Sequence, residues 1–144
     1  MKQRVLIAED DFLIAEGALR PALSTDFEII GVVGDGMAAV TATSAERPDI
    51  VLLDVSLPRL RGFDAARQIL AGQPECKVLF VSNYWDAAYI DAARDMGAAG
   101  YVFKSRVMTD LVSAIRTALS GRFYDPVRQG ATVSRDAETK AGQK

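Results

Sequence analysis

Residues 50–54 read Ile-Val-Leu-Leu-Asp, a continuous apolar run that ends abruptly in a carboxylate. Unbroken apolar residues, rather than alternating ones, are typical of a strand that is covered on both faces in a parallel sheet. Four further runs of the same character lie on either side of it, at residues 5–8, 29–33, 78–81 and 101–103. The sequence therefore predicts five buried parallel strands.

Segments with helical periodicity separate these runs. Two apolar stripes have helical spacing; they comprise Ile14, Ala18, Leu19, Ala22 and Leu23 in the first segment, and Leu111, Ile115, Ala118 and Leu119 in the last. Asp35 and Asp86 are placed to cap the second and fourth helices, and the second is expected to stop before Arg47-Pro48. Gly72 and Gly97 are placed to end the third and fourth helices. This alternation predicts an α/β fold, a doubly wound five-stranded parallel sheet of (βα)5 type with helices on both faces.

The composition limits the class of protein. The chain has 144 residues, 49% of them hydrophobic, with 17 Lys and Arg against 19 Asp and Glu. This length suits one domain with a buried core, and the charge is too close to neutral for a nucleic-acid surface. We expect no membrane segment or signal peptide, and the single cysteine, Cys76, favours the cytoplasm. The absence of histidine excludes histidine-based zinc sites and catalytic triads.

The periodic pattern ends at Gly121. Residues 122–144 are rich in small, polar and charged residues and have no apolar periodicity. We therefore predict one domain over residues 1–121, followed by a flexible C-terminal tail over residues 122–144. The tail is too short for a helix-turn-helix domain, so no output domain is expected within this chain.

Polar residues of unusual type follow four of the five expected strands. They are Glu9, Asp10 and Asp11 after the first strand, Asp54 after the third, Ser82 after the fourth and Lys104 after the fifth. The carboxyl ends of parallel strands share one edge of the sheet, where such sheets bind their ligands. We therefore expect these side chains to converge on a single pocket.

Each of these residues also has an ordinary structural explanation. An acidic residue after a strand often caps the next helix, which would account for Asp10 or Asp11. Ser82 could be a turn residue and Lys104 a solvated lysine. The complete set at one edge of a sheet is far less frequent by chance than any member alone, which favours a functional role.

Three carboxylates, a hydroxyl and a lysine in one pocket suit phosphoryl transfer. Clustered negative charges repel unless a cation joins them, and carboxylate oxygens favour Mg²⁺, held by Asp10 and Asp54. Lys104 supplies a point charge for a phosphoryl oxygen, and Ser82 supplies a hydrogen bond. Asp54 faces all of these groups, so it is the candidate nucleophile that forms an acyl phosphate.

Four motifs occur in a fixed order along the chain. They are the acidic pair Glu9-Asp10, the run Leu52-Leu53-Asp54-Val55-Ser56-Leu57-Pro58 followed by Gly62, the hydroxyl of Ser82, and the run Tyr101-Val102-Phe103-Lys104. Between residue 4 and about residue 121, this set resembles a response-regulator receiver domain of two-component signalling. The resemblance implies a flavodoxin-like fold and a cytoplasmic phosphoprotein of a phosphorelay.

The resemblance also implies a role for each site residue. Asp54 would take a phosphoryl group from a sensor histidine kinase or a histidine phosphotransfer protein. The protein would not be an enzyme beyond catalysing its own phosphorylation and dephosphorylation, to which Lys104 and Ser82 would contribute. Asp10, Asp54 and the backbone carbonyl of Ser56 would ligate Mg²⁺, with Glu9 acting nearby or through water. Ser82 and Tyr101 would form a switch, in which the hydroxyl moves toward the phosphate and the ring follows it.

The chain departs from the usual receiver pattern at three places. Asn83 follows the switch hydroxyl where most receivers have a small residue, and we expect it to narrow access to the acyl phosphate. Ser105 follows Lys104 where many receivers have a cis proline, so we expect a trans bond. Residues 121–126 resemble the exit from receivers that precede a helix-turn-helix domain.

Two other functions use similar residues. A phosphatase of the haloacid-dehalogenase type also forms an aspartyl phosphate, but its nucleophile sits after the first strand in an Asp-x-Asp pattern that residues 9–12 lack. A flavin-binding relative would offer hydroxyls and glycines there rather than acids. The stronger alternative is a receiver-like module that binds protein partners without being phosphorylated.

Output is expected to proceed by protein contact. The usual contact face of receivers is formed by the fourth helix (86–97), the fifth strand (101–103) and the fifth helix (111–119). We expect a phosphorylation-dependent homodimer through this face. Tyr84, Trp85 and Tyr89 lie on or near its edge, where ordinary packing is an equally good explanation for them.

Overall fold

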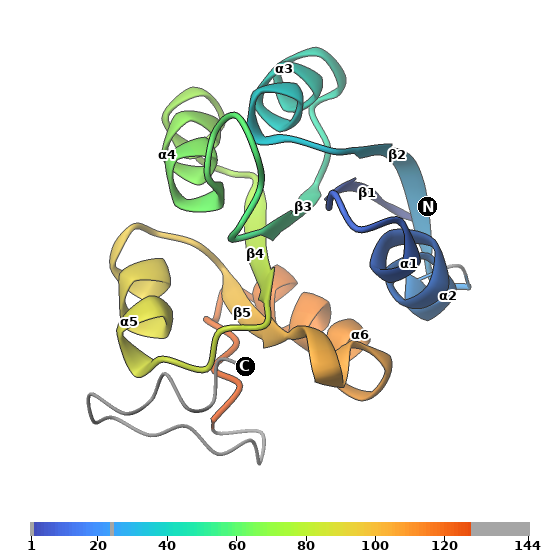
Figure 1. Cartoon of the computed structure of the whole chain (residues 1–144), viewed down its shortest axis with the longest axis vertical. Helices are drawn as coiled ribbons and strands as arrows, with labels where there is room; N and C mark the ends of the chain where they lie inside the picture. The colour runs from blue at the N-terminus through green and yellow to red at the C-terminus, as the bar shows by residue number, and fades with distance from the viewer. Residues whose placement is uncertain (1, 24, 128–144) are drawn as a thin grey trace.

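The computed structural model describes residues 2–23 and 25–127 and shows helices packed around a five-stranded parallel sheet (Figure 1). The strands lie in the order β2-β1-β3-β4-β5, and every adjacent pair is parallel. Their bounds are β1 Gln3–Ala8, β2 Phe27–Val33, β3 Ile50–Asp54, β4 Lys77–Ser82 and β5 Gly100–Phe103. This order confirms the predicted doubly wound, flavodoxin-like sheet.

Helices cover both faces of the sheet, as predicted (Figure 1). Their bounds are α1 Phe12–Ile14, η1 Ala15–Leu19, α2 Arg20–Leu23, α3 Gly36–Glu46, α4 Gly62–Gly72, α5 Ala87–Asp95, η2 Lys104–Arg106 and α6 Val107–Leu119. Side chains of α3, α4 and α5 fill the core on one face, and those of η1, α2 and α6 fill it on the other. Among the described residues, no helix is both long enough and apolar enough to cross a lipid bilayer.

The first helix is interrupted by a π-helical turn, η1, which the apolar stripe did not predict. Pro21 has no N–H, so it cannot donate the α-helical hydrogen bond to the carbonyl of Gly17. A wider turn accommodates this missing bond. The stripe itself still faces the core, because Leu19 and Leu23 are buried.

Helix ends agree with the predictions except at one cap. The carboxylate of Asp35 accepts a hydrogen bond from the N–H of Ala38 at 2.8 Å and caps α3, which ends at Glu46 as expected. Gly72 is the last residue of α4, and Gly97 follows α5 with φ +94°. Asp86 occupies the N-cap position of α5, but its side chain makes no capping hydrogen bond, so that prediction was wrong in its mechanism.

The chain remains packed beyond the boundary expected at Gly121. Tyr124 forms a parallel bridge with Gly100 and is 1% exposed. Its ring joins the core beside Val102 and Leu111. The expectation of a flexible tail was therefore wrong for residues 122–127, because burial of this aromatic side chain stabilises the segment. The remainder of the expected tail, residues 128–144, lies outside the described residues.

Candidate functional site

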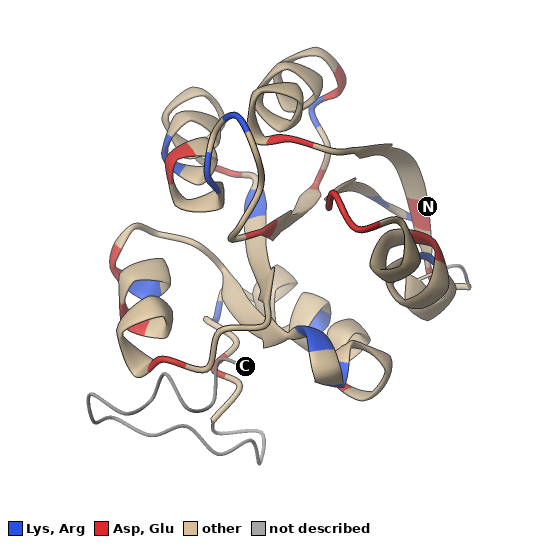
Figure 2. Cartoon of the chain, in the orientation of Figure 1, with Lys and Arg blue, Asp and Glu red and all other residues tan. Residues whose placement is uncertain are grey.

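Three acidic side chains meet where β1 and β3 end. Glu9, Asp10 and Asp54 each offer a carboxylate oxygen, and these oxygens lie within 4.8 Å of one another. Figure 2 shows the acidic loop after β1 and the acidic end of β3 on the same side of the sheet. Glu9 and Asp54 are only 3% and 4% exposed, whereas Asp10 is exposed. The adjacency arises because β1 and β3 are neighbours in register, with Ala8 opposite Leu53.

Asp11 has a structural role instead. Its carboxylate accepts hydrogen bonds from the N–H groups of Leu13 and Ile14 and caps α1. Its own N–H donates to the carboxylate of Glu9 at 3.0 Å. The capping explanation is thus correct for Asp11, while Asp10 belongs to the acidic cluster.

Lys104 brings a positive charge to the cluster from the end of β5. Its Nζ lies 3.0 Å from Oε1 of Glu9 and 3.2 Å from Oδ2 of Asp54. The lysine side chain is 9% exposed, so the ion pairs are largely shielded from water. The bond between Lys104 and Ser105 is trans, as predicted. These contacts span 95 and 50 residues of sequence, and only the parallel sheet brings them together.

The single ammonium of Lys104 does not balance the three carboxylates, and the pKa values of Glu9 and Lys104 are raised accordingly. Burial first and the charge of Asp54 second raise the pKa of Glu9 to about 7, because the N–H of Asp11 and the ammonium of Lys104 offset only part of their effect. Burial acts to lower the pKa of Lys104, but the carboxylates of Asp54 and Glu9 outweigh it, so that pKa is raised. The site therefore carries a surplus of buried negative charge.

The donor set fits a hard divalent cation. The three carboxylates provide oxygen ligands only, at a spacing that one small ion can bridge, and the surplus charge favours a second cation beside Lys104. This cluster is typical of a Mg²⁺ site. Receiver-type coordination would add the backbone carbonyl of Ser56, which lies in the loop directly after β3.

A glycine lets the loop after β3 lie against the end of that strand. A Cβ atom at Gly62 would stand 2.3 Å from the carbonyl oxygen of Asp54 and 2.8 Å from Cα of Val55, so no larger residue fits. The N–H of Gly62 donates to the carbonyl of Val55 at 3.0 Å, and the N–H of Ser56 donates to Oδ1 of Asp54 at 3.2 Å. The loop thereby orients the carboxylate of Asp54.

A pocket of about 160 Å³ opens onto Asp54. Its lining residues are Asp54, Ser56, Asn83, Tyr84 and Lys104. Oγ of Ser56 lies 3.4 Å from the hydroxyl of Tyr84 across this pocket. Asn83 lines the pocket, in line with the sequence-based expectation. Tyr84 also lines it, which the sequence analysis did not predict; the only available signal was its position two residues after Ser82.

Ser82 and Tyr101 are both linked to the backbone of Tyr84. The hydroxyl of the fully buried Ser82 accepts a hydrogen bond from the N–H of Tyr84 at 2.9 Å. The hydroxyl of Tyr101 donates to the carbonyl of Tyr84 at 3.0 Å, and its ring is also fully buried. Burial, partly offset by a hydrogen bond with Ser82, raises the pKa of Tyr101. The two predicted switch residues therefore hold the same loop residue, one on each side.

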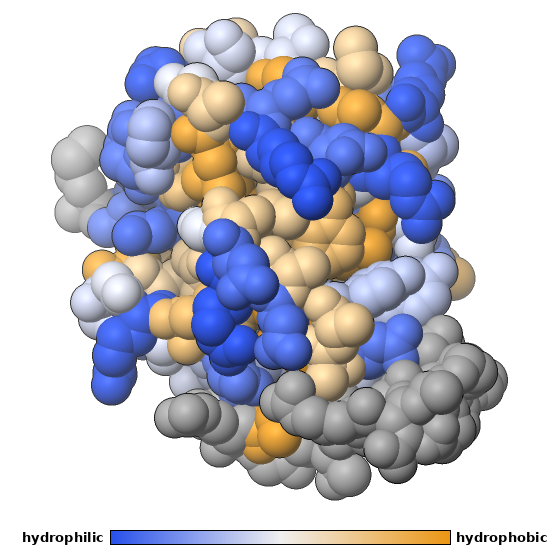
Figure 3. Space-filling view, turned by 90° about the vertical axis from the view of Figure 1, so that its left-hand side faces the viewer, coloured by the Kyte–Doolittle hydropathy of each residue, from blue (hydrophilic) through white to orange (hydrophobic). Residues whose placement is uncertain are grey.

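The aromatic residues expected at a contact face pack largely within the molecule. Trp85 stacks on Phe103 with ring centroids 4.3 Å apart, and Tyr84 and Tyr89 are 5.1 Å apart. Figure 3 shows the side of the molecule that carries α4 and α5, where apolar residues form a band between charged ones. Ordinary packing thus accounts for much of this cluster, and Phe63 joins it through an edge-on contact with Tyr89.

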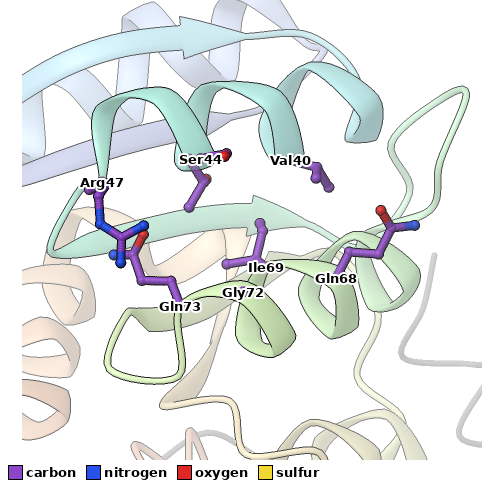
Figure 4. A pocket seen from close by; sticks show the side chains of 8 residues that line it. Val40, Ser44, Arg47, Gln68, Ile69, Gly72 and Gln73 are labelled. Atoms are coloured by element: carbon purple, nitrogen blue, oxygen red, sulfur yellow. The ribbon is translucent and has the colours of Figure 1, made fainter.

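A second pocket, of about 170 Å³, lies between α3 and α4 (Figure 4). Its lining residues are Val40, Thr43, Ser44, Arg47, Gln68, Ile69, Gly72 and Gln73. None of these is acidic, and all but Val40 belong to the C-terminal halves of the two helices or to the residues just beyond. The pocket therefore lies at the opposite edge of the sheet from the acidic cluster and is separate from the candidate site.

Fold and site together define a receiver-type signalling domain: a 2-1-3-4-5 parallel sheet with acids and a lysine at the carboxyl ends of its strands. The chain belongs to the response regulator receiver domain family, which its sequence matches over residues 5–116.

The sequence is similar to several bacterial regulators. The transcriptional regulatory protein PdtaR of Mycobacterium tuberculosis is 36% identical over 141 residues, which cover 96% of this chain and 68% of PdtaR. The transcriptional regulatory protein YxjL of Bacillus subtilis is 33% identical over 122 residues, which cover 83% of this chain and 56% of YxjL. The chain thus spans about two thirds of the first relative and just over half of the second.

Solved structures of the same fold include close matches. A two-component response regulator of the LuxR family from Aurantimonas sp. SI85-9A1 has a TM-score of 0.80 at 28% identity, over 86% of this chain and 89% of that one. The signal receiver domain of NarL from Mycobacterium tuberculosis has a TM-score of 0.77 at 32% identity, over 84% of this chain and 98% of that one.

Proposed function

We propose that Asp54 accepts a phosphoryl group from the phosphohistidine of a sensor histidine kinase or a histidine phosphotransfer protein. A carboxylate oxygen of Asp54 attacks the phosphorus, the phosphorus–nitrogen bond of the donor breaks, and the imidazole leaves and takes up a proton. The product is an acyl phosphate, which water later hydrolyses. The chemistry assigned to the chain is limited to this self-phosphorylation and the later hydrolysis of its own acyl phosphate.

The position of Asp54 relative to Lys104 carries the proposal. Asp54 is almost fully buried at the base of a pocket, and Nζ of Lys104 is 3.2 Å from its carboxylate. Lys104 can follow the negative charge from the carboxylate to a phosphoryl oxygen, and Glu9 helps to hold the ammonium in place. Mg²⁺ bound by Asp10, Asp54 and the Ser56 carbonyl would neutralise charge on the transferred group.

Ser82 and Tyr101 would communicate the phosphorylation. A phosphoryl group on Asp54 offers strong acceptor oxygens to the O–H of Ser82, and a turn of this side chain toward them would carry its oxygen away from the N–H of Tyr84. Because Tyr101 holds the carbonyl of the same residue, a shift of Tyr84 reaches both predicted switch residues. The physical basis is a new dianion that biases one loop between two arrangements.

We propose that the output is a protein contact on the face of α5, β5 and α6, in the form of a phosphorylation-dependent homodimer. Sedimentation with beryllofluoride and Mg²⁺ tests this, and unchanged sedimentation would contradict it.

The proposed compartment is the cytoplasm. Burial raises the pKa of the Cys76 thiol to about 12, so this buried thiol is a weak nucleophile at neutral pH.

Intact-mass measurement tests the proposed function. The protein is incubated with Mg²⁺ and a small acyl phosphate, and the expected result is a gain of one phosphoryl group that Asp54→Asn abolishes. No gain in the unmodified protein would favour the alternative, a binding module that works without phosphorylation. Continuous turnover of phosphate monoesters would instead indicate a phosphatase.

A further inference from the structure

The segment after α6 is bonded to the edge of β5 next to a predicted switch residue. The N–H of Tyr124 donates to the carbonyl of Ala99 at 3.0 Å, and the carbonyl of Tyr124 accepts from the N–H of Tyr101 at 3.1 Å. A Cβ atom at Gly100 would lie 2.8 Å from Cβ of Tyr124, so this close approach requires a glycine. The segment is thus fitted to the sheet edge.

Arg94, in the last turn of α5, clamps the same segment from the other side. Its Nη2 lies 2.8 Å from Oδ2 of Asp125, whose side chain is 13% exposed. Its guanidinium also lies 4.6 Å from the ring centroid of Phe123. A partly shielded ion pair and a cation–π contact on one arginine thus connect α5 to the segment.

Both anchors lead back to the loop beside Asp54. Tyr101 binds the segment through its backbone N–H and binds the carbonyl of Tyr84 through its hydroxyl. α5, which carries Arg94, begins at Ala87, only a few residues after Tyr84. The loop residue that is held by Ser82 therefore connects to the segment by two short routes.

We propose that residues 123–125 form a latch that is docked while Asp54 is unmodified and loosened when Asp54 carries a phosphoryl group. The inference rests on the proposed function and extends it to the C-terminal side of the domain. When the side chain of Ser82 turns to donate its O–H to the phosphoryl group, its oxygen leaves the N–H of Tyr84 and the loop shifts. The shift moves the hydroxyl partner of Tyr101 and the start of α5, which weakens both anchors of the latch.

Hydrogen exchange of the full chain tests the latch. Beryllofluoride with Mg²⁺ mimics the phosphoryl group, and fluorine NMR establishes independently whether it is bound. We expect the amides of Tyr124 and Tyr101 to exchange about threefold faster or more on binding, while amides of β3 do not change. Bound beryllofluoride with unchanged or slower exchange at these amides would overturn the latch and leave the proposed function intact. Absence of binding would overturn both.

Reciprocity provides a second test. If binding loosens the latch, then releasing the latch must strengthen binding by the same factor. Arg94→Gln removes the clamp and is expected to tighten beryllofluoride binding by about twofold to threefold. The control is Arg67→Gln, which removes an exposed arginine that pairs with Asp64 within α4. Equal affinities for both variants and the unmodified protein would contradict the proposed coupling.

Discussion

The carboxyl ends and the amino ends of the parallel strands form two edges of the sheet, and these edges differ in how far their charged side chains are buried. At the carboxyl edge, Glu9, Asp54 and Lys104 are buried, and negative charge is in surplus. At the amino edge, Arg47 pairs with Glu75 at 3.3 Å, but these side chains are 57% and 67% exposed, and water screens them. Burial without charge balance is costly, and this arrangement lies at the site where we propose that the chain binds a cation and accepts a phosphoryl group.

Removing Lys104 should lower the unfolding free energy far more than removing an arginine at the amino edge, and this is the largest effect expected. Lys104→Met leaves Glu9 and Asp54 buried without their cation, so we expect a loss of about 3 kcal/mol of unfolding free energy at pH 7 in EDTA. Arg47→Met at the amino edge should cost less than about 0.5 kcal/mol. Urea unfolding measures both values, and similar losses for the two variants would remove the distinction drawn here.

The raised pKa of Glu9 predicts a pH dependence of the opposite sign to an ordinary ion-paired acid. The folded pKa of about 7 exceeds the ordinary 4.5, so the folded chain holds this proton more tightly than the unfolded chain. The associated stability is complete below about pH 4.5 and is lost as the pH rises through 7, by about 3 kcal/mol in EDTA. In the unmodified protein and in Glu46→Gln, the denaturant midpoint should fall as the pH rises across this range. In Glu9→Gln this fall should be much smaller, and an equally steep fall in Glu9→Gln would refute the assignment.

Metal binding should depend on the exposed acid of the cluster. Asp10→Asn removes one carboxylate ligand, and we expect Mg²⁺ affinity to fall about tenfold or more. Trp85 is the only tryptophan and stacks on Phe103, the residue before Lys104, so its fluorescence is a convenient readout. Glu46→Gln at the amino edge is the matched control, and equal Mg²⁺ affinities in the two variants would argue against this site.

The smallest effect is expected at the mouth of the pocket. Asn83 and Tyr84 line it, and the hydroxyl of Tyr84 lies near Ser56. Asn83→Ala and Tyr84→Ala should admit water and shorten the lifetime of the acyl phosphate by about threefold. Tyr84→Phe keeps the ring and should change the lifetime less. Identical dephosphorylation half-times in all four proteins would show that neither residue restricts access.

Much of the fold and the centre of the site could be predicted because they follow from simple rules. Continuous apolar runs identify all five strands, and the shared edge of parallel strands predicts that Glu9, Asp10, Asp54 and Lys104 lie together, as they do. Those residues stand directly at strand ends, where the geometry is fixed by the sheet. The chemistry of the set then followed from charge and ligand preference.

The features that were missed depend on single tertiary contacts rather than on periodic patterns. Tyr124 docks through one bridge and one buried ring, which leave no repeating signal in residues 122–127. Tyr84 enters the pocket through loop geometry, and Asp86 stands at a cap position without making the capping bond. The π-helical turn did have a visible cause, since Pro21 removes a helical donor.

Reductive trapping of the acyl phosphate tests the central claim most directly. Borohydride reduces an aspartyl phosphate to homoserine, and peptide sequencing by mass spectrometry then identifies the residue that carried the phosphoryl group. After incubation with a phosphodonor and Mg²⁺, the account predicts homoserine at position 54, and none there when Lys104→Met or metal chelation disables the site. Homoserine at another acidic position, or none in the unmodified protein, would contradict it.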